Sequence, residues 1–130
     1  MEFPADLKYT DNDEWIRVEG DVGSTGITDY AQDQLSDIVY IEITATVGEE
    51  LAQGDAIAEV ESVKAAAFAY MPVDGVITEI NEDLADDPEK INSDPYGEAW
   101  VIKFKVTNPS QLEPLINASA YKKHCEEREH

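Results

Sequence analysis

The fold is decided by the stretch Gly54-Asp55-Ala56-Ile57-Ala58-Glu59-Val60-Glu61-Ser62-Val63-Lys64-Ala65-Ala66. Its residues 56–61 and the following residues 66–71 both have strand composition, and a short polar connection separates them, which predicts a hairpin. Gly54-Asp55 and Asp74-Gly75 supply turns at the two ends of this hairpin.

Lys64 stands near the middle of this symmetric unit, and no other Lys or Arg occurs between Arg17 and Lys90. A lone lysine at a hairpin tip is held away from the body of a domain, where an enzyme can reach and acylate it. A solvated lysine in a tight turn is the simpler interpretation of the same spacing, and the position of Lys64 alone favours it while leaving acylation open.

The remaining segments extend the β-rich pattern over most of the chain. We expect strands at 14–19, 38–46, 76–80 and 100–106, and a short helix at 30–35 capped by Thr28 or Asp29. In the second strand, Val39, Ile41 and Ile43 are expected to share one face. Residues 83–97 resemble a loop, and the apolar spacing after Pro109 predicts a helix over 110–123.

These elements predict a mainly β (α+β) fold, a small barrel or sandwich with a helix in the N-terminal half and a C-terminal helix. At 130 residues with no linker, we expect a single domain over 1–130, with 126–130 as a frayed tail.

The net charge of −20 argues against nucleic acid and against anionic membranes as partners. The only histidines are His124 and His130, and Cys125, expected to be an exposed thiol, is the only cysteine. A catalytic triad, a Cys-His pair or a histidine-rich metal site in the body of the protein is therefore excluded, and no metal site is expected. The N-terminal residues lack the pattern of a signal peptide, which favours a reducing, cytoplasmic setting.

Several motifs in the same order resemble the glycine cleavage system H protein family. They are Glu61-Ser62-Val63-Lys64-Ala65, Met71-Pro72-Val73-Asp74-Gly75, Glu14-Trp15-Ile16-Arg17-Val18-Glu19-Gly20, Gly26-Ile27-Thr28-Asp29-Tyr30-Ala31-Gln32, and Ile91-Asn92-Ser93-Asp94-Pro95-Tyr96-Gly97 followed by Trp100. Biotin carriers use a related hairpin but usually place Met on both sides of the lysine, where this chain has Val63 and Ala65.

The resemblance implies a flattened barrel-sandwich hybrid of the lipoyl/biotinyl-carrier type, with lipoate linked through an amide bond to Lys64. Such a protein is a carrier and not an enzyme, because the cofactor supplies the chemistry. Its lipoyl-lysine swinging arm takes an aminomethyl group and reducing equivalents between glycine decarboxylase, aminomethyltransferase and dihydrolipoyl dehydrogenase. A lipoate ligase or lipoyl transferase would attach the arm.

The resemblance also implies a polar cleft that holds the loaded arm, and in this sequence the corresponding positions are Glu14, Asn12, Ile27, Gln34 and Phe68. Of the several positions that differ from the family's usual motifs, three bear on this cleft. Asp13 replaces a histidine, Gln34 replaces another histidine, and Phe68 replaces a carboxylate that can pair with a protonated amine. A charge-assisted hydrogen bond of this kind contributes roughly 1.5–3 kcal/mol, so we expect weaker protection of the loaded arm.

These departures leave other functions open. One is an H-like lipoate-binding protein that carries sulfur intermediates with a heterodisulfide-reductase-like complex, and another is a lipoyl relay for 2-oxoacid dehydrogenases. An interaction-only module, in which Lys64 stays unmodified, is the alternative without a cofactor.

Overall fold

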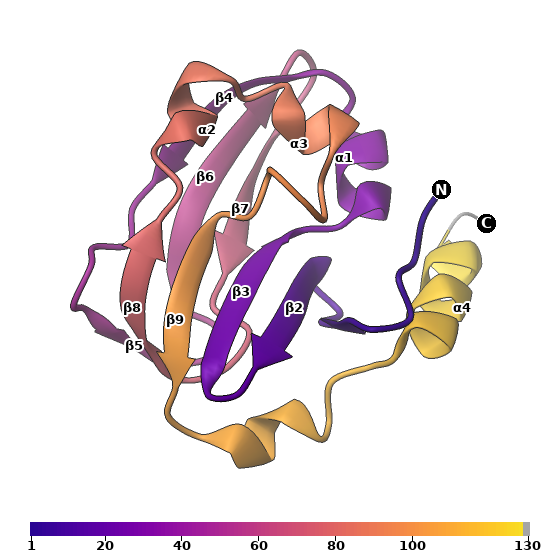
Figure 1. Ribbon diagram of the computed structural model, residues 1–130. Helices are drawn as coiled ribbons and strands as arrows, with labels where there is room; N and C mark the ends of the chain where they lie inside the picture. Colours follow the sequence, from indigo (N-terminus) through magenta and orange to yellow (C-terminus); the bar gives the residue numbers. More distant parts are fainter. Residues whose placement is uncertain (129–130) are drawn as a thin grey trace.

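The computed structural model describes residues 1–128, which form two antiparallel sheets with short helices around them (Figure 1). The strands are β1 (Lys8–Tyr9), β2 (Glu14–Glu19), β3 (Val22–Ile27), β4 (Ile38–Ile43), β5 (Glu50–Leu51), β6 (Ala56–Ser62), β7 (Ala66–Tyr70), β8 (Gly75–Ile80) and β9 (Ile102–Val106). The helices are α1 (Asp29–Leu35), α2 (Asp83–Asp86), α3 (Lys90–Ser93), the 3-10 helix η1 (Pro109–Leu112) and α4 (Ala118–Arg128).

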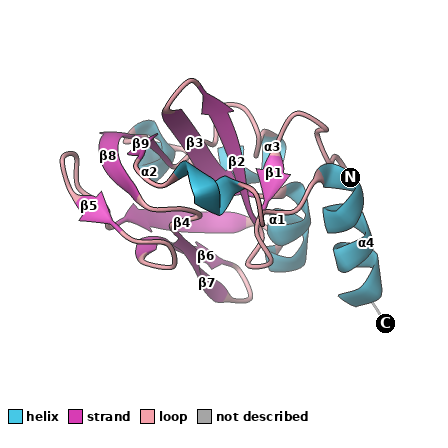
Figure 2. Ribbon diagram, turned by 90° about the horizontal axis from the view of Figure 1, so that it is seen from below, coloured by secondary structure: helices cyan, strands magenta, loops and turns pink. Residues whose placement is uncertain are grey.

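The larger sheet has the strand order β1-β2-β3-β9-β8-β5, and the smaller sheet has the order β4-β6-β7. The two sheets lie in different layers of the molecule, with the smaller one below the larger one in Figure 2. The main core draws on both sheets, since Ile41, Val60 and Ala69 of the smaller sheet cluster with Ile77 and Phe104 of the larger one. This arrangement confirms the predicted barrel-sandwich architecture.

Close packing around Phe104 explains why β3 contains glycine. A Cβ atom on Gly23, which pairs with Phe104 across β3 and β9, would lie 2.7 Å from that ring. Gly26 is similarly constrained, since its Cβ would lie 2.9 Å from the indole nitrogen of Trp15. The sequence pattern does not predict β3, because glycine ordinarily disfavours a strand. Here the side chains packed against Gly23 and Gly26 leave no room for a larger residue.

The predicted hairpin is confirmed, with Glu61 paired to Ala66 next to its tip. The predicted helix near residue 30 is also confirmed, and the Thr28 hydroxyl caps it by accepting from the Ala31 N–H at 3.1 Å. In β4, however, an irregularity between Ile38 and Tyr40 turns Val39 outward, where it is 55% exposed. The expectation that Val39 shares the buried face of Ile41 was therefore wrong.

The helix predicted over 110–123 was wrong in its position. The chain forms η1, turns at Pro114 and pairs Ile116 with Tyr9 in an isolated bridge before α4 begins at Ala118. Pro114 lacks the N–H that an uninterrupted helix needs at that position. Leu112 and Leu115 still pack against the main core, so their apolar character reflects burial without helical periodicity.

Residues 83–97 and the C-terminal segment both contain helix that the sequence pattern did not predict. The expected loop holds α2 and α3, and residues 126–128 of the expected frayed tail continue α4, whereas 129–130 lie outside the described residues. Cys125 is 2% exposed and packs in a second core cluster with Tyr9, Trp15 and Tyr121, so the expected exposed thiol was wrong.

Candidate functional site

Lys64 lies at the tip of the β6–β7 hairpin, and its side chain is exposed to solvent. The Ser62 hydroxyl organises this tip, because it accepts from the backbone N–H groups of Lys64 at 3.2 Å and Ala65 at 3.0 Å. The Val63 N–H donates to the carbonyl of Asp37 at 3.0 Å. The backbone around Lys64 is therefore fixed while its amine remains accessible.

A cleft of about 180 Å³ opens beside the hairpin, between β7, α1 and the loop before β2. Its lining contains Asn12, Ile27, Gln34 and Phe68, four of the five residues predicted for an arm cleft. The other lining residues are Asp13, Ala31, Leu35, Val60 and Ala67. Most of this lining is aliphatic or aromatic, and Asn12, Asp13 and Gln34 are its polar members, so the cleft suits an apolar chain that also carries polar groups.

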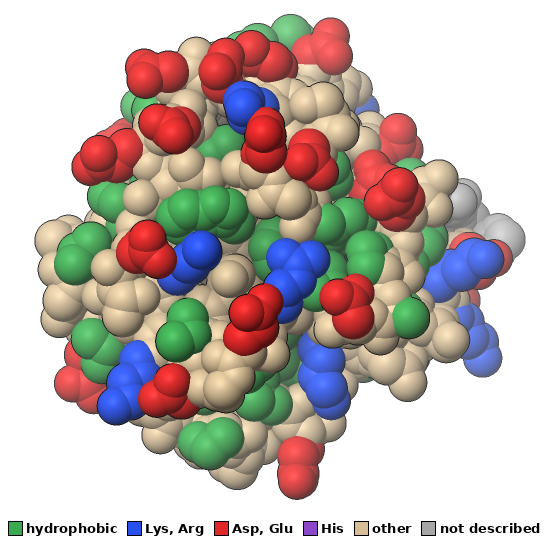
Figure 3. Space-filling view, in the orientation of Figure 1, with side chains coloured by type: hydrophobic (Ala, Val, Ile, Leu, Met, Phe, Trp, Pro, Cys, Tyr) green, Lys and Arg blue, Asp and Glu red, His purple; other side chains and the backbone are tan. Residues whose placement is uncertain are grey.

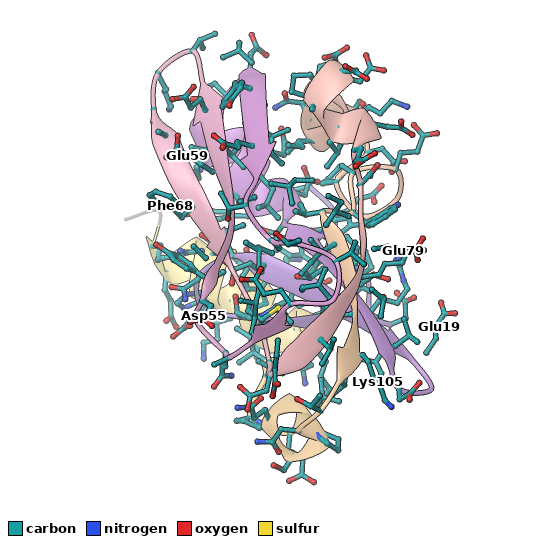
Figure 4. All side chains as sticks on the ribbon, turned by 90° about the vertical axis from the view of Figure 1, so that its left-hand side faces the viewer. Glu19, Asp55, Glu59, Phe68, Glu79 and Lys105 are labelled. Carbon is teal, nitrogen blue, oxygen red and sulfur yellow. The ribbon has the colours of Figure 1, made fainter. Side chains whose placement is uncertain are left out.

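Phe68 forms the outer edge of this cleft and remains 51% exposed. It pairs with Glu59 across β6 and β7, and Figure 4 labels both side chains on the smaller sheet. Where the family's usual motif has a carboxylate, this cleft therefore presents an aromatic ring.

Glu14, the fifth predicted residue, does not line that cleft but borders a neighbouring pocket of about 460 Å³. The two hollows share Asn12. Glu14 is 2% exposed, and its carboxylate accepts from the Thr10 hydroxyl at 2.7 Å and from the Tyr70 N–H at 3.4 Å. Burial raises the pKa of Glu14 to about 7, and these two hydrogen bonds oppose the rise.

The loop that carries Asn12 is held in place by Tyr121 and Arg128, two residues that the sequence motifs do not include. Asp13 has a left-handed backbone conformation, with φ of 69°. Its carboxylate receives hydrogen bonds from Tyr121 and Arg128 of α4, 108 and 115 residues further along the chain. No local pattern indicates contacts across such a separation, so the part played by α4 could be found only from the structure.

Within residues 1–128, no group of three or more His, Cys, Asp and Glu side chains is placed to hold a metal ion. In the same part of the chain, every helix is too short or too polar to cross a membrane. The described residues do place an exposed lysine, Lys64, on the hairpin beside a mainly apolar cleft.

A family model described as glycine cleavage H-protein matches residues 7–128. The glycine cleavage system H protein of Bacteroides thetaiotaomicron is 52% identical over 94% of this chain and 96% of its own length. That of Methylacidiphilum infernorum is 49% identical over 99% of this chain and the whole of its own length. The chain belongs to the glycine cleavage H-protein family.

A solved structure supports the same assignment at the level of the fold. The crystal structure of a glycine cleavage system H protein from Mycobacterium marinum superposes with a TM-score of 0.83 and 35% identity, covering 92% of this chain and 96% of its own. Members of the H-protein family are lipoyl carriers that partner the glycine cleavage enzymes and are not themselves enzymes. The assignment favours the glycine cleavage interpretation over the sulfur carrier and the relay.

Proposed function

We propose that Lys64 carries the lipoyl group in amide linkage and that the chain presents this arm to the glycine cleavage enzymes. The observation that supports this most directly is the position of Lys64, exposed at a hairpin tip whose backbone Ser62 and Asp37 hold in place. Amide formation removes the lysine charge and leaves an apolar chain that ends in a dithiolane.

The residues beside the hairpin fit such an arm. Ile27, Leu35 and Val60 offer apolar contact for an aliphatic chain, and Asn12 and Gln34 offer hydrogen-bonding groups in the same cleft. When bound, the lipoyl group supplies an exchangeable disulfide that carries the aminomethyl unit and two electrons. The protein itself presents the arm to its partners and protects it from solvent between them.

Tethering also gives a carrier that is not itself an enzyme a clear role in the reaction. An arm attached to a docked carrier reaches a partner's active site at a much higher effective concentration than a free cofactor would. We assign the modification itself to a lipoate ligase or lipoyl transferase, and we propose a cytoplasmic location in keeping with the reducing chemistry of a dithiol.

The test is lipoylation by a lipoate ligase, followed by intact mass measurement and peptide mapping. We expect one lipoyl group on the wild-type chain, located on Lys64, and none on Lys64→Arg. Lys90→Arg serves as the matched control, because Lys90 lies on α3 in an exposed ion pair with Glu98. A lipoyl group on Lys64→Arg, or an unmodified wild-type chain, would contradict the proposal.

A further inference from the structure

The last turn of α4 is joined directly to one wall of the arm cleft. Arg128 donates two hydrogen bonds to the Asp13 carboxylate, from Nη2 to Oδ1 at 2.6 Å and from Nη1 to Oδ2 at 3.1 Å. This two-point arrangement fixes the orientation of both groups, which a single ion pair does not. Asp13 and its neighbour Asn12 both line the cleft.

Tyr121 adds a second contact from the same helix. Its hydroxyl donates to Asp13 Oδ1 at 2.9 Å and lies 2.6 Å from the hydroxyl of Thr28. Since the Tyr121 proton is directed to Asp13, Thr28 is the donor in the second bond. Thr28 is the N-cap of α1, so the network connects the 10–13 loop, α1 and α4.

Asp13 needs such support because its backbone conformation is unfavourable. At φ of 69° it occupies the left-handed region, which Asp tolerates better than most residues but still at a free-energy cost. Its carbonyl accepts from the Thr28 N–H at 3.0 Å and its own N–H donates to the Thr10 carbonyl at 3.3 Å. The side-chain bonds from α4 supplement these backbone contacts.

Arg128 also contacts α1, a helix whose other residues line the cleft. Its guanidinium carbon lies 4.5 Å from the ring centroid of Tyr30, a buried residue of α1. Ala31, Gln34 and Leu35 of the same helix line the cleft. A single side chain therefore links the Asn12–Asp13 wall to the α1 wall.

We propose that Arg128 is a positioning residue that fixes the Asn12–Asp13 wall against α1, so that the C-terminal helix determines how firmly the cleft retains the arm. The part of this proposal that concerns retention of an arm rests on the proposed function. The part that concerns the contact between Arg128 and the Asn12–Asp13 wall does not. Without Arg128, the 10–13 loop keeps its backbone hydrogen bonds but loses the two-point contact that orients Asp13.

The first test uses the unmodified protein and amide hydrogen exchange. Arg128→Gln is expected to accelerate exchange at residues 12–14 by about five- to tenfold, the effect of losing a charge-assisted hydrogen bond, while β6 amides keep their rates. Lys123→Gln removes the same charge from an exposed position of α4 and is expected to leave both regions unchanged. Arg128→Lys retains the charge without the two-point geometry and should give an intermediate rate.

The second test measures how fast the lipoylated, aminomethyl-loaded protein releases its cargo when no partner is present. Arg128→Gln is expected to release it several-fold faster than wild type and Lys123→Gln. Unchanged exchange at residues 12–14, or equal acceleration of all slow amides, would overturn the positioning role. Failure of the wild-type chain to accept a lipoyl group would contradict the proposed function instead, and the exchange data would still decide the role of Arg128.

Discussion

At the scale of single residues, Glu14 has the most unusual environment in the candidate site. It is an acid buried beneath the 10–13 loop, with hydrogen bonds from Thr10 and Tyr70 and no cation paired with it among the ion pairs of residues 1–128. Burial penalises its charged form, which raises the pKa to about 7 from an ordinary value of 4.5. The protonation state of Glu14 therefore changes within the physiological range.

This shift makes the free energy of unfolding depend on pH. Because the folded pKa lies above the unfolded one, the folded state binds the extra proton between these values, and stability falls as pH rises from about 4.5 to 7. A shift of this size corresponds to about 3 kcal/mol. Urea unfolding should show that the free energy of unfolding of the wild type falls from pH 5 to pH 8. The fall should exceed that of Glu14→Gln by up to this amount. Parallel pH profiles for the two proteins would show that Glu14 is not shifted.

Phe68 gives a second prediction at the residue scale, concerning retention of the loaded arm. Phe68→Asp places a carboxylate at the cleft edge, where it can pair with the protonated amine of the cargo, and should slow spontaneous release by up to about tenfold. The new carboxylate also faces Glu59 across the strands, which costs a few tenths of a kcal/mol or more. Phe68→Asn is the control, because it removes the ring without adding a charge. Equal rates of cargo release from Phe68→Asp and Phe68→Asn would contradict an ion pair between the carboxylate and the amine.

At the scale of elements, the hairpin tip depends on one hydroxyl. Ser62→Ala removes the acceptor for the N–H groups of Lys64 and Ala65, so those amides should exchange several-fold faster while the free energy of unfolding changes by only about 1 kcal/mol. Lipoylation by the ligase should slow by a similar factor. Ser93→Ala, at the exposed end of α3, is the control. Unchanged exchange rates at Lys64 and Ala65 would mean that the backbone turn orders the tip without the Ser62 hydroxyl.

The elements also show what the sequence can and cannot predict. The β6–β7 hairpin was predicted because alternation and turn residues are local signals that act over a few positions. The α4 helix was misplaced because Pro114 interrupts a segment whose apolar residues are buried without helical geometry. The cleft residues Asn12, Ile27, Gln34 and Phe68 come from four separate segments, so their assembly followed from family resemblance and not from spacing.

At the scale of the whole molecule, the excess of acidic groups dominates the electrostatics. The net charge is −20, and Figure 3 shows Asp and Glu gathered over α2 and α3, with Lys and Arg mainly lower on the same face and near α4. Only two ion pairs, Lys90–Glu98 and Arg128–Asp13, occur in residues 1–128. Mutual repulsion among carboxylates therefore opposes folding at low ionic strength.

Screening of this repulsion should stabilise the protein. Raising NaCl from about 0.05 M to about 0.5 M shortens the Debye length to a few ångströms and should raise Tm by several degrees. The double variant Asp86→Asn/Asp87→Asn, at the end of α2, should have a higher Tm at low salt and a smaller salt effect. A Tm that falls with salt would indicate that the ion pairs outweigh the repulsion.

With the proposed lipoyl group on Lys64, this chain would be the carrier of the glycine cleavage cycle. The most direct measurement is the intact mass of the lipoylated protein before and after addition of glycine and glycine decarboxylase. We predict an added aminomethyl group on the lipoylated wild-type chain and no addition to Lys64→Arg. A lipoylated wild-type chain that gains no aminomethyl group would show that the protein is not this carrier.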